Sequence, residues 1–115
     1  WRASGMYGTP GYLNDVYTKT EEEKSLIPQE FILFQNYPNP FNPVTTIGWQ
    51  TPISGWQTLK IYDILGNEVE TLVDEYRNAG GYYEEFDAKN LASGVYIYKL
   101  QAADFMSSKK MLLLK

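Results

Sequence analysis

The stretch that decides the fold reads LASGVYIYKL and occupies residues 91–100. Because side chains on a β-strand alternate between the two faces of a sheet, Tyr96, Tyr98 and Leu100 fall on one face and the residues between them on the other. Neither face is fully polar, which favours a central strand over an edge strand. Gly94 permits a backbone conformation or a close approach that a Cβ atom would block, and we expect Leu91 to fold back onto the end of the sheet.

Outward from this strand, short β-type runs separated by turn residues recur from Phe31 onward. We expect seven strands, near residues 31–35, 45–51, 56–63, 68–73, 81–87, 94–101 and 106–114. Such spacing is typical of an all-β sandwich or barrel. The sequence also predicts a tight hairpin with positive φ at Gly66-Asn67 and further reversals at Gly80-Gly81 and Ala103-Asp104.

The same alternation predicts the core of the domain. The expected inward-facing pairs are Leu59 with Ile61, Ile47 with Trp49, and Met111 with Leu113. In the last strand, Lys110, Leu112 and Leu114 then face outward. We therefore expect the segment 109–115 to close the sandwich and to display a basic, apolar edge.

The most unusual local feature is the run NYPNPFNP at residues 36–43. Each proline fixes its own φ, removes a hydrogen-bond donor and restricts the residue before it, so the loop has little freedom to lose on folding. We interpret it as a stiff crossover pinned by Tyr37 and Phe41. A ligand site is the alternative.

The composition limits the possible functions. The 115 residues carry 10 Lys plus Arg against 14 Asp plus Glu, a formal charge of −4, which disfavours binding to nucleic acid and to anionic lipid. Cysteine and histidine are both missing from the sequence, which removes thiolate catalysis, the commonest metal ligand and the usual general base. Neighbouring carboxylates such as Glu84 and Glu85 should point to opposite faces of a strand rather than form an acid–base pair. We expect no enzyme activity, cofactor or metal.

The aromatic content of the chain is high, with ten Tyr, five Phe and three Trp. Exposed rings could bind glycans. In a sandwich of this size we expect most of them to serve the core.

The chain divides into three parts. Residues 31–115 carry the strand pattern, whereas residues 18–30 are charged, lack alternation and read as an acidic linker, with a short acidic helix as the alternative. Residues 1–17 are interpreted as the remnant of a preceding domain, and the whole as the end of a longer precursor. No apolar run approaches the roughly 20 residues that a membrane-spanning helix needs.

Four stretches in this order resemble the type A C-terminal sorting domain of the type IX secretion system. They are residues 34–43, residues 61–63 with Gly66, residues 91–96 and residues 109–115. The resemblance implies an immunoglobulin-like antiparallel β-sandwich. It also implies export from the periplasm of a Gram-negative bacterium across the outer membrane to the cell surface.

The resemblance further implies the partners of the domain. These are an N-terminal cargo domain, the type IX outer-membrane translocon, and a sortase-like surface peptidase that removes the domain and commonly joins the cargo to an anionic lipopolysaccharide. The residues that it marks for sorting are Pro38, Asn39, Pro40, Leu91, Gly94, Tyr96, Lys109, Lys110 and Lys115.

Two other resemblances compete or add to this one. The flagellar-hook-cap immunoglobulin-like module has similar motifs, so a retained structural or adhesive module, including a glycan-binding one, is the alternative function. Residues 1–14 are similar to the closing strand and loop of a lamin-tail domain, which is the basis for the expected remnant.

Overall fold

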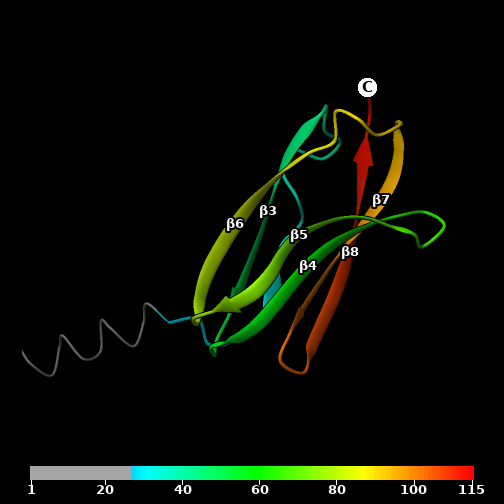
Figure 1. Cartoon of the computed structure of the whole chain (residues 1–115). Coiled ribbons are helices and arrows are strands. Elements are labelled where there is room, and N and C mark those ends of the chain that lie inside the picture. Colours follow the sequence, from blue (N-terminus) through cyan, green and yellow to red (C-terminus); the bar gives the residue numbers. More distant parts are fainter. Residues whose placement is uncertain (1–26) are drawn as a thin grey trace, which may run out of the picture.

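The computed structural model describes residues 27–115, which form strands and no helix (Figure 1). The strands are β2 (Ile32–Leu33), β3 (Val44–Thr51), β4 (Gly55–Asp63), β5 (Glu68–Arg77), β6 (Gly80–Asp87), β7 (Gly94–Ala102) and β8 (Phe105–Leu113). All seven strands expected from the sequence are therefore present. The first is shorter than expected and β5 runs four residues further, to Arg77. The expected remnant at residues 1–17 lies outside the described residues, as does most of the expected linker.

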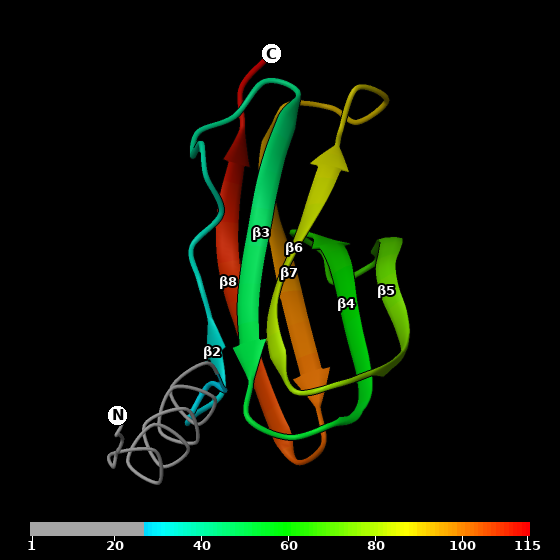
Figure 2. The same ribbon diagram turned by 90° about the vertical axis from the view of Figure 1, so that its left-hand side faces the viewer.

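The strands pair into two antiparallel sheets that pack face to face (Figures 1 and 2). The smaller sheet has the order β2-β3-β6 and the larger one β5-β4-β7-β8. Strand β7 pairs with β4 on one side and with β8 on the other, so the expectation that it is central is confirmed. The chain is an all-β sandwich, as its strand spacing and turn residues predict.

The core lies between the sheets and follows the predicted alternation. On β7, the side chains of Tyr96, Tyr98 and Leu100 are buried, and those of the residues between them are only partly so. The other predicted pairs are also buried, with Ile47 and Trp49 on β3, Leu59 and Ile61 on β4, and Met111 and Leu113 on β8. Burial of these apolar side chains is the main favourable contribution to folding.

Buried polar side chains join the two sheets through this core. The Trp49 indole on β3 donates a hydrogen bond to Gln57 Oε1 on β4 at 2.9 Å, and Gln57 Nε2 donates in turn to Thr51 Oγ1 at 3.3 Å. Because an unpaired polar group in a core is costly, these bonds also fix how the sheets align.

Two of the three predicted reversals are hairpin turns. Gly66, at φ +90°, lies between β4 and β5, and Ala103, at φ +54°, lies between β7 and β8. The third reversal is different, because β5 and β6 belong to different sheets. Gly80, at φ +156°, therefore lies where the chain crosses from one sheet to the other. In the part of the chain that the structure describes, no helix has the length and apolar character to cross a membrane.

Candidate functional site

Three segments that are far apart in the sequence meet at one end of the sandwich, near the label C in Figure 1. They are residues 36–43, residues 88–94 and residues 110–115, and we call them together the motif end. The proline-rich segment lies along the end of β8. Phe41 donates its N–H to the Leu112 carbonyl and accepts from Leu114 N–H, both at 3.0 Å. Asn39 Oδ1 accepts from Leu112 N–H at 3.0 Å.

Residues 88–94 complete the motif end from the other side. Lys115 donates its backbone N–H to Ser93 Oγ at 3.0 Å, and its ammonium group donates to the Lys89 carbonyl. The Tyr96 hydroxyl donates to the Ala92 carbonyl at 2.7 Å. Leu91 is partly buried and packs on the core, as predicted. The last residues of the chain thus hold two loops together.

Asn36 is a buried anchor of the motif end that sequence reasoning missed. Its Nδ2 donates to the Pro38 carbonyl at 3.1 Å and to Thr45 Oγ1 at 3.0 Å, and its backbone N–H donates to the Tyr98 hydroxyl at 2.8 Å. An asparagine just before a proline-rich loop is a signal for such local bonds, because its short amide reaches nearby backbone groups. The Tyr98 partner is 62 residues away and leaves no local signal.

The structure confirms one of the two expected pins of the proline-rich loop and contradicts the other. Phe41 is 2% exposed and packs in the core, but Tyr37 is 80% exposed. The backbone of Tyr37, rather than its ring, fixes the loop, because its N–H and carbonyl both bond to Thr46 at 3.0 and 2.9 Å. With Asn36 facing inward, the next side chain must face outward.

The exposed ring of Tyr37 belongs to a larger aromatic surface. It lines a groove of about 360 Å³ on the smaller sheet, together with Phe34, Gln35, Thr46, Gly48 and Tyr83. The expectation that most rings serve the core does not hold for several of the described tyrosines, although Tyr82 packs against it. Tyr76 and Tyr83 are 61% and 76% exposed, whereas only Tyr96 and Tyr98 are buried. The strands β5 and β6 that carry the exposed pair lie at the edges of the sheets.

The three lysines of the terminal segment do not form one patch. Lys110 is exposed on the outer face of β8, and Lys109 is partly buried on the face that carries Met111. Lys115 lies beyond the strand, with its ammonium group on the Lys89 carbonyl. The expected open edge is also partly closed, because Gln35 Nε2 donates to the Lys110 carbonyl at 2.8 Å and Asn39 and Phe41 cover Leu112. Pro38 and Pro40 are exposed beside it.

Gly94, at the start of β7, has the unusual backbone that the sequence predicts, but not the close packing. Its φ is +153°, and a Cβ atom there would meet nothing within 4 Å. We expect Gly94→Val to cost about 1–3 kcal/mol through backbone strain alone and to lower export through misfolding. Urea unfolding of this variant and of Gly55→Val provides the check. Gly55 has equally open surroundings without the special φ, so an equal effect at both sites would contradict the assignment.

Tyr98 ties the proline-rich segment to the core and should make stability depend on alkaline pH. Its hydroxyl donates to the Phe34 carbonyl at 2.7 Å, and burial raises the pKa of the phenol to about 12, against the hydrogen bond from Asn36, which lowers it. The unfolded phenol ionises near pH 10. The unfolded state therefore loses its proton first, so the Tyr98 contribution is complete below pH 10 and falls as pH rises toward 12.

We expect this alkaline loss to be on the order of 2 kcal/mol. Tyr98→Phe should remove that part of the pH dependence and cost about 1–3 kcal/mol at neutral pH, because two backbone groups lose their partner. Denaturant unfolding from pH 8 to pH 12 measures both effects. Parallel pH profiles for the two proteins would show that Tyr98 does not carry the dependence.

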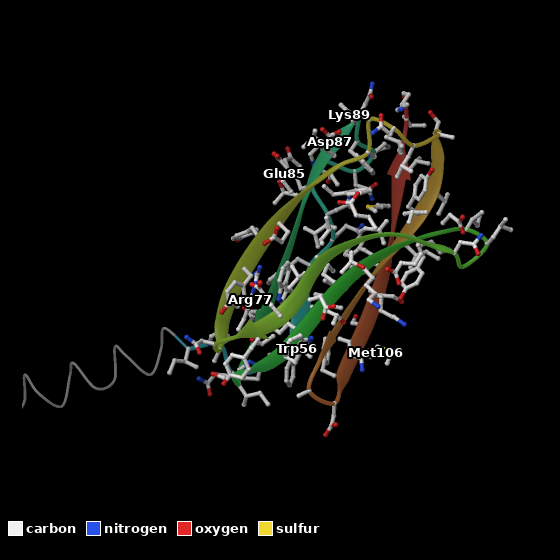
Figure 3. The ribbon with its side chains drawn as sticks, in the orientation of Figure 1. Trp56, Arg77, Glu85, Asp87, Lys89 and Met106 are labelled. Carbon is white, nitrogen blue, oxygen red and sulfur yellow. The ribbon has the colours of Figure 1, made fainter. Side chains whose placement is uncertain are left out.

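No group of three or more acidic side chains within residues 27–115 could hold a metal ion. Glu84 accepts from Arg77 at 3.1 Å, whereas Glu85 points to the opposite face of β6, as predicted (Figure 3). The interactions that hold the motif end together are hydrogen bonds of backbone, amide, hydroxyl and ammonium groups.

A comparison with known protein families finds a match over most of the chain. The secretion system C-terminal sorting domain matches residues 35–114, which include the proline-rich segment, residues 88–94 and the whole terminal strand β8. No curated protein matches the chain.

Proposed function

Since the chain belongs to the secretion system C-terminal sorting domain family, a sorting signal for type IX secretion, we propose that its motif end is the part that the export machinery reads. A sorting domain of this kind implies an attached cargo and the type IX machinery, and it leads to secretion or the cell surface. The family is not a catalytic one, and the alternative of a retained adhesive or glycan-binding module is not favoured.

One observation carries the proposal. The segments marked as sorting motifs lie far apart in the sequence, yet they share hydrogen bonds at one end of the fold, such as that between Asn39 and Leu112, 73 residues apart. Core packing alone does not require these segments to meet, because the side chains of Pro38, Asn39, Pro40 and Lys110 are exposed. Exposed residues that the fold brings together suit recognition by another protein.

The proposed export route has two further steps, translocation of the cargo and removal of the sorting domain. The sorting domain carries its N-terminal cargo from the periplasm of a Gram-negative bacterium through the outer-membrane translocon. A sortase-like surface peptidase then removes the domain and joins the cargo to lipopolysaccharide. The cut falls between Asn14 and Phe31, a charged stretch of the kind that proteases favour. Phe31 supports this boundary, because its ring stacks on Phe105 at 4.9 Å and so already belongs to the sandwich.

The test is export of an inert reporter. A reporter with a signal peptide is fused in front of residues 1–115 and produced in a bacterium with a type IX system and in a matched strain without the translocon. We expect surface or medium reporter only in the first strain, with its new end between residues 14 and 31 by mass spectrometry. Equal export from both strains would overturn the sorting role, and peptides of residues 94–115 retained in bulk on the mature reporter would overturn the cleavage step.

A further inference from the structure

The turn between β4 and β5 carries two large aliphatic side chains that the fold does not use. Ile64 is 69% exposed and Leu65 is 83% exposed. Turn positions favour glycine, asparagine, aspartate, serine and proline, so neither residue is there for turn formation. Figure 1 shows this turn standing away from the two sheets. Exposed apolar residues are common singly, but an adjacent pair at the apex of a projecting turn calls for a partner.

The backbone beneath the pair is held in one conformation. The Asp63 carboxylate accepts from Leu65 N–H and Asn67 N–H, both at 2.9 Å, and from Asn67 Nδ2 at 3.3 Å. Asp63 also exchanges backbone hydrogen bonds with Gly66 and Asn67, and Gly66 has a φ of +90°. A turn fixed in this way loses little freedom when it binds, so that a small contact can still contribute usefully to affinity.

The charges around the turn indicate the chemistry of the partner. Residues 63–70 contain three carboxylates, on Asp63, Glu68 and Glu70, and no cation. Among the ion pairs of residues 27–115, only Glu68 of these three has a basic partner, Lys60 at 3.5 Å. Hydrogen bonds from Asn67 to Asp63 and from Thr71 to Glu68 lower the pKa values of these two carboxyls, so both stay charged at neutral pH. We call these three carboxylates the acidic collar of the turn. An anionic lipid surface would repel the collar, whereas a protein pocket with a basic rim would attract it.

We propose that Ile64 and Leu65 form a docking tip that inserts into an apolar pocket, rimmed by Lys or Arg, on a protein of the export machinery. The tip is separate from the motif end, since none of its hydrogen bonds joins it to residues 36–43, 88–94 or 110–115. This inference rests on the proposed function, because a sorting signal needs surfaces that a partner reads.

The test uses the reporter fusion of residues 1–115 with four versions of the chain. Ile64→Ser with Leu65→Ser removes the apolar tip, and Leu65→Met keeps it apolar. Met106→Ser is the matched control, because Met106 is also apolar, 58% exposed and close to a hairpin turn. Glu70→Lys reverses one charge of the collar.

We expect export of the double serine variant to fall roughly tenfold or more, with a melting temperature within about 3 °C of the unmodified chain. The Leu65→Met and Met106→Ser variants should be exported normally, and Glu70→Lys should be exported less. Normal export of the double variant would overturn the docking tip, and normal export of Glu70→Lys would overturn the basic rim. Failure of the unmodified fusion to be exported would instead overturn the sorting role.

A binding assay distinguishes a lipid partner of the docking tip from a protein partner. The purified chain is mixed with vesicles of zwitterionic lipid, with and without anionic lipid, and sedimented. We expect no binding to either. Binding that disappears in the double serine variant would assign the tip to a membrane surface and overturn the protein pocket.

Discussion

Met111→Asp should strongly lower the stability of the domain at neutral pH and, with it, export. Met111 is 1% exposed and belongs to the core cluster, where it lies opposite Tyr96 in the pairing of β7 with β8. The change removes buried apolar volume and places a carboxylate in the core. We expect a cost of about 4 kcal/mol or more, against a total stability of roughly 5–15 kcal/mol for native proteins.

The pH dependence of this variant identifies the buried charge as the cause. Burial raises the pKa of the introduced carboxyl above its unfolded value, so the folded state holds its proton more tightly. Stability is then highest at low pH and falls as pH rises through the folded pKa. Circular dichroism melts between pH 4 and pH 8 measure the effect. Met111→Leu, which roughly conserves volume, is the control and should cost less than about 1.5 kcal/mol. An unchanged melting temperature for Met111→Asp at pH 7 would contradict the prediction.

The strands could be predicted from the sequence because their signals are local. Alternation of Tyr96 and Tyr98 with their neighbours depends only on adjacent residues, and the hairpin at Gly66 depends on a few more. Gly80 illustrates the limit of local signals. A turn residue predicts that the chain reverses, but it does not predict which sheet the next strand joins. The inward side of an irregular loop is equally hard to assign, so the sequence predicts Tyr37 and Phe41 alike as pins of the loop although the ring of Tyr37 is exposed.

The motif end could be predicted only as a set of residues. Family resemblance marks Pro38 to Pro40, Leu91 to Tyr96 and the lysines, but pairings between segments determine their arrangement. Lys115 bonds to the loop carbonyl of a residue 26 positions earlier, and Asn39 to a strand 73 positions later. Such contacts follow from the register of β8 beside β7, which no residue near either partner specifies.

Replacement of Lys109, Lys110 and Lys115 by Gln separates recognition from folding. Three charges are lost, yet none of these side chains contributes much to the core, since Lys110 and Lys115 are exposed and Lys109 is only partly buried. We expect the free energy of unfolding to change by about 1 kcal/mol or less, most of it from the Lys115 bond to the Lys89 carbonyl. If the machinery reads the basic end, export should fall roughly tenfold or more and the fusion should accumulate in the periplasm.

Single variants assign the effect to particular lysines. Lys109→Gln is the control, because its side chain shares the inner face of β8 with Met111 and is the least accessible to a partner. Lys110→Gln and Lys115→Gln should each lower export, and Lys110→Arg with Lys115→Arg should restore it, because the charge is kept. Melting temperatures and reporter export are measured for each variant. Normal export of the triple Gln variant, beside reduced export of Met111→Asp, would mean that the machinery reads the shape of the motif end rather than its lysines.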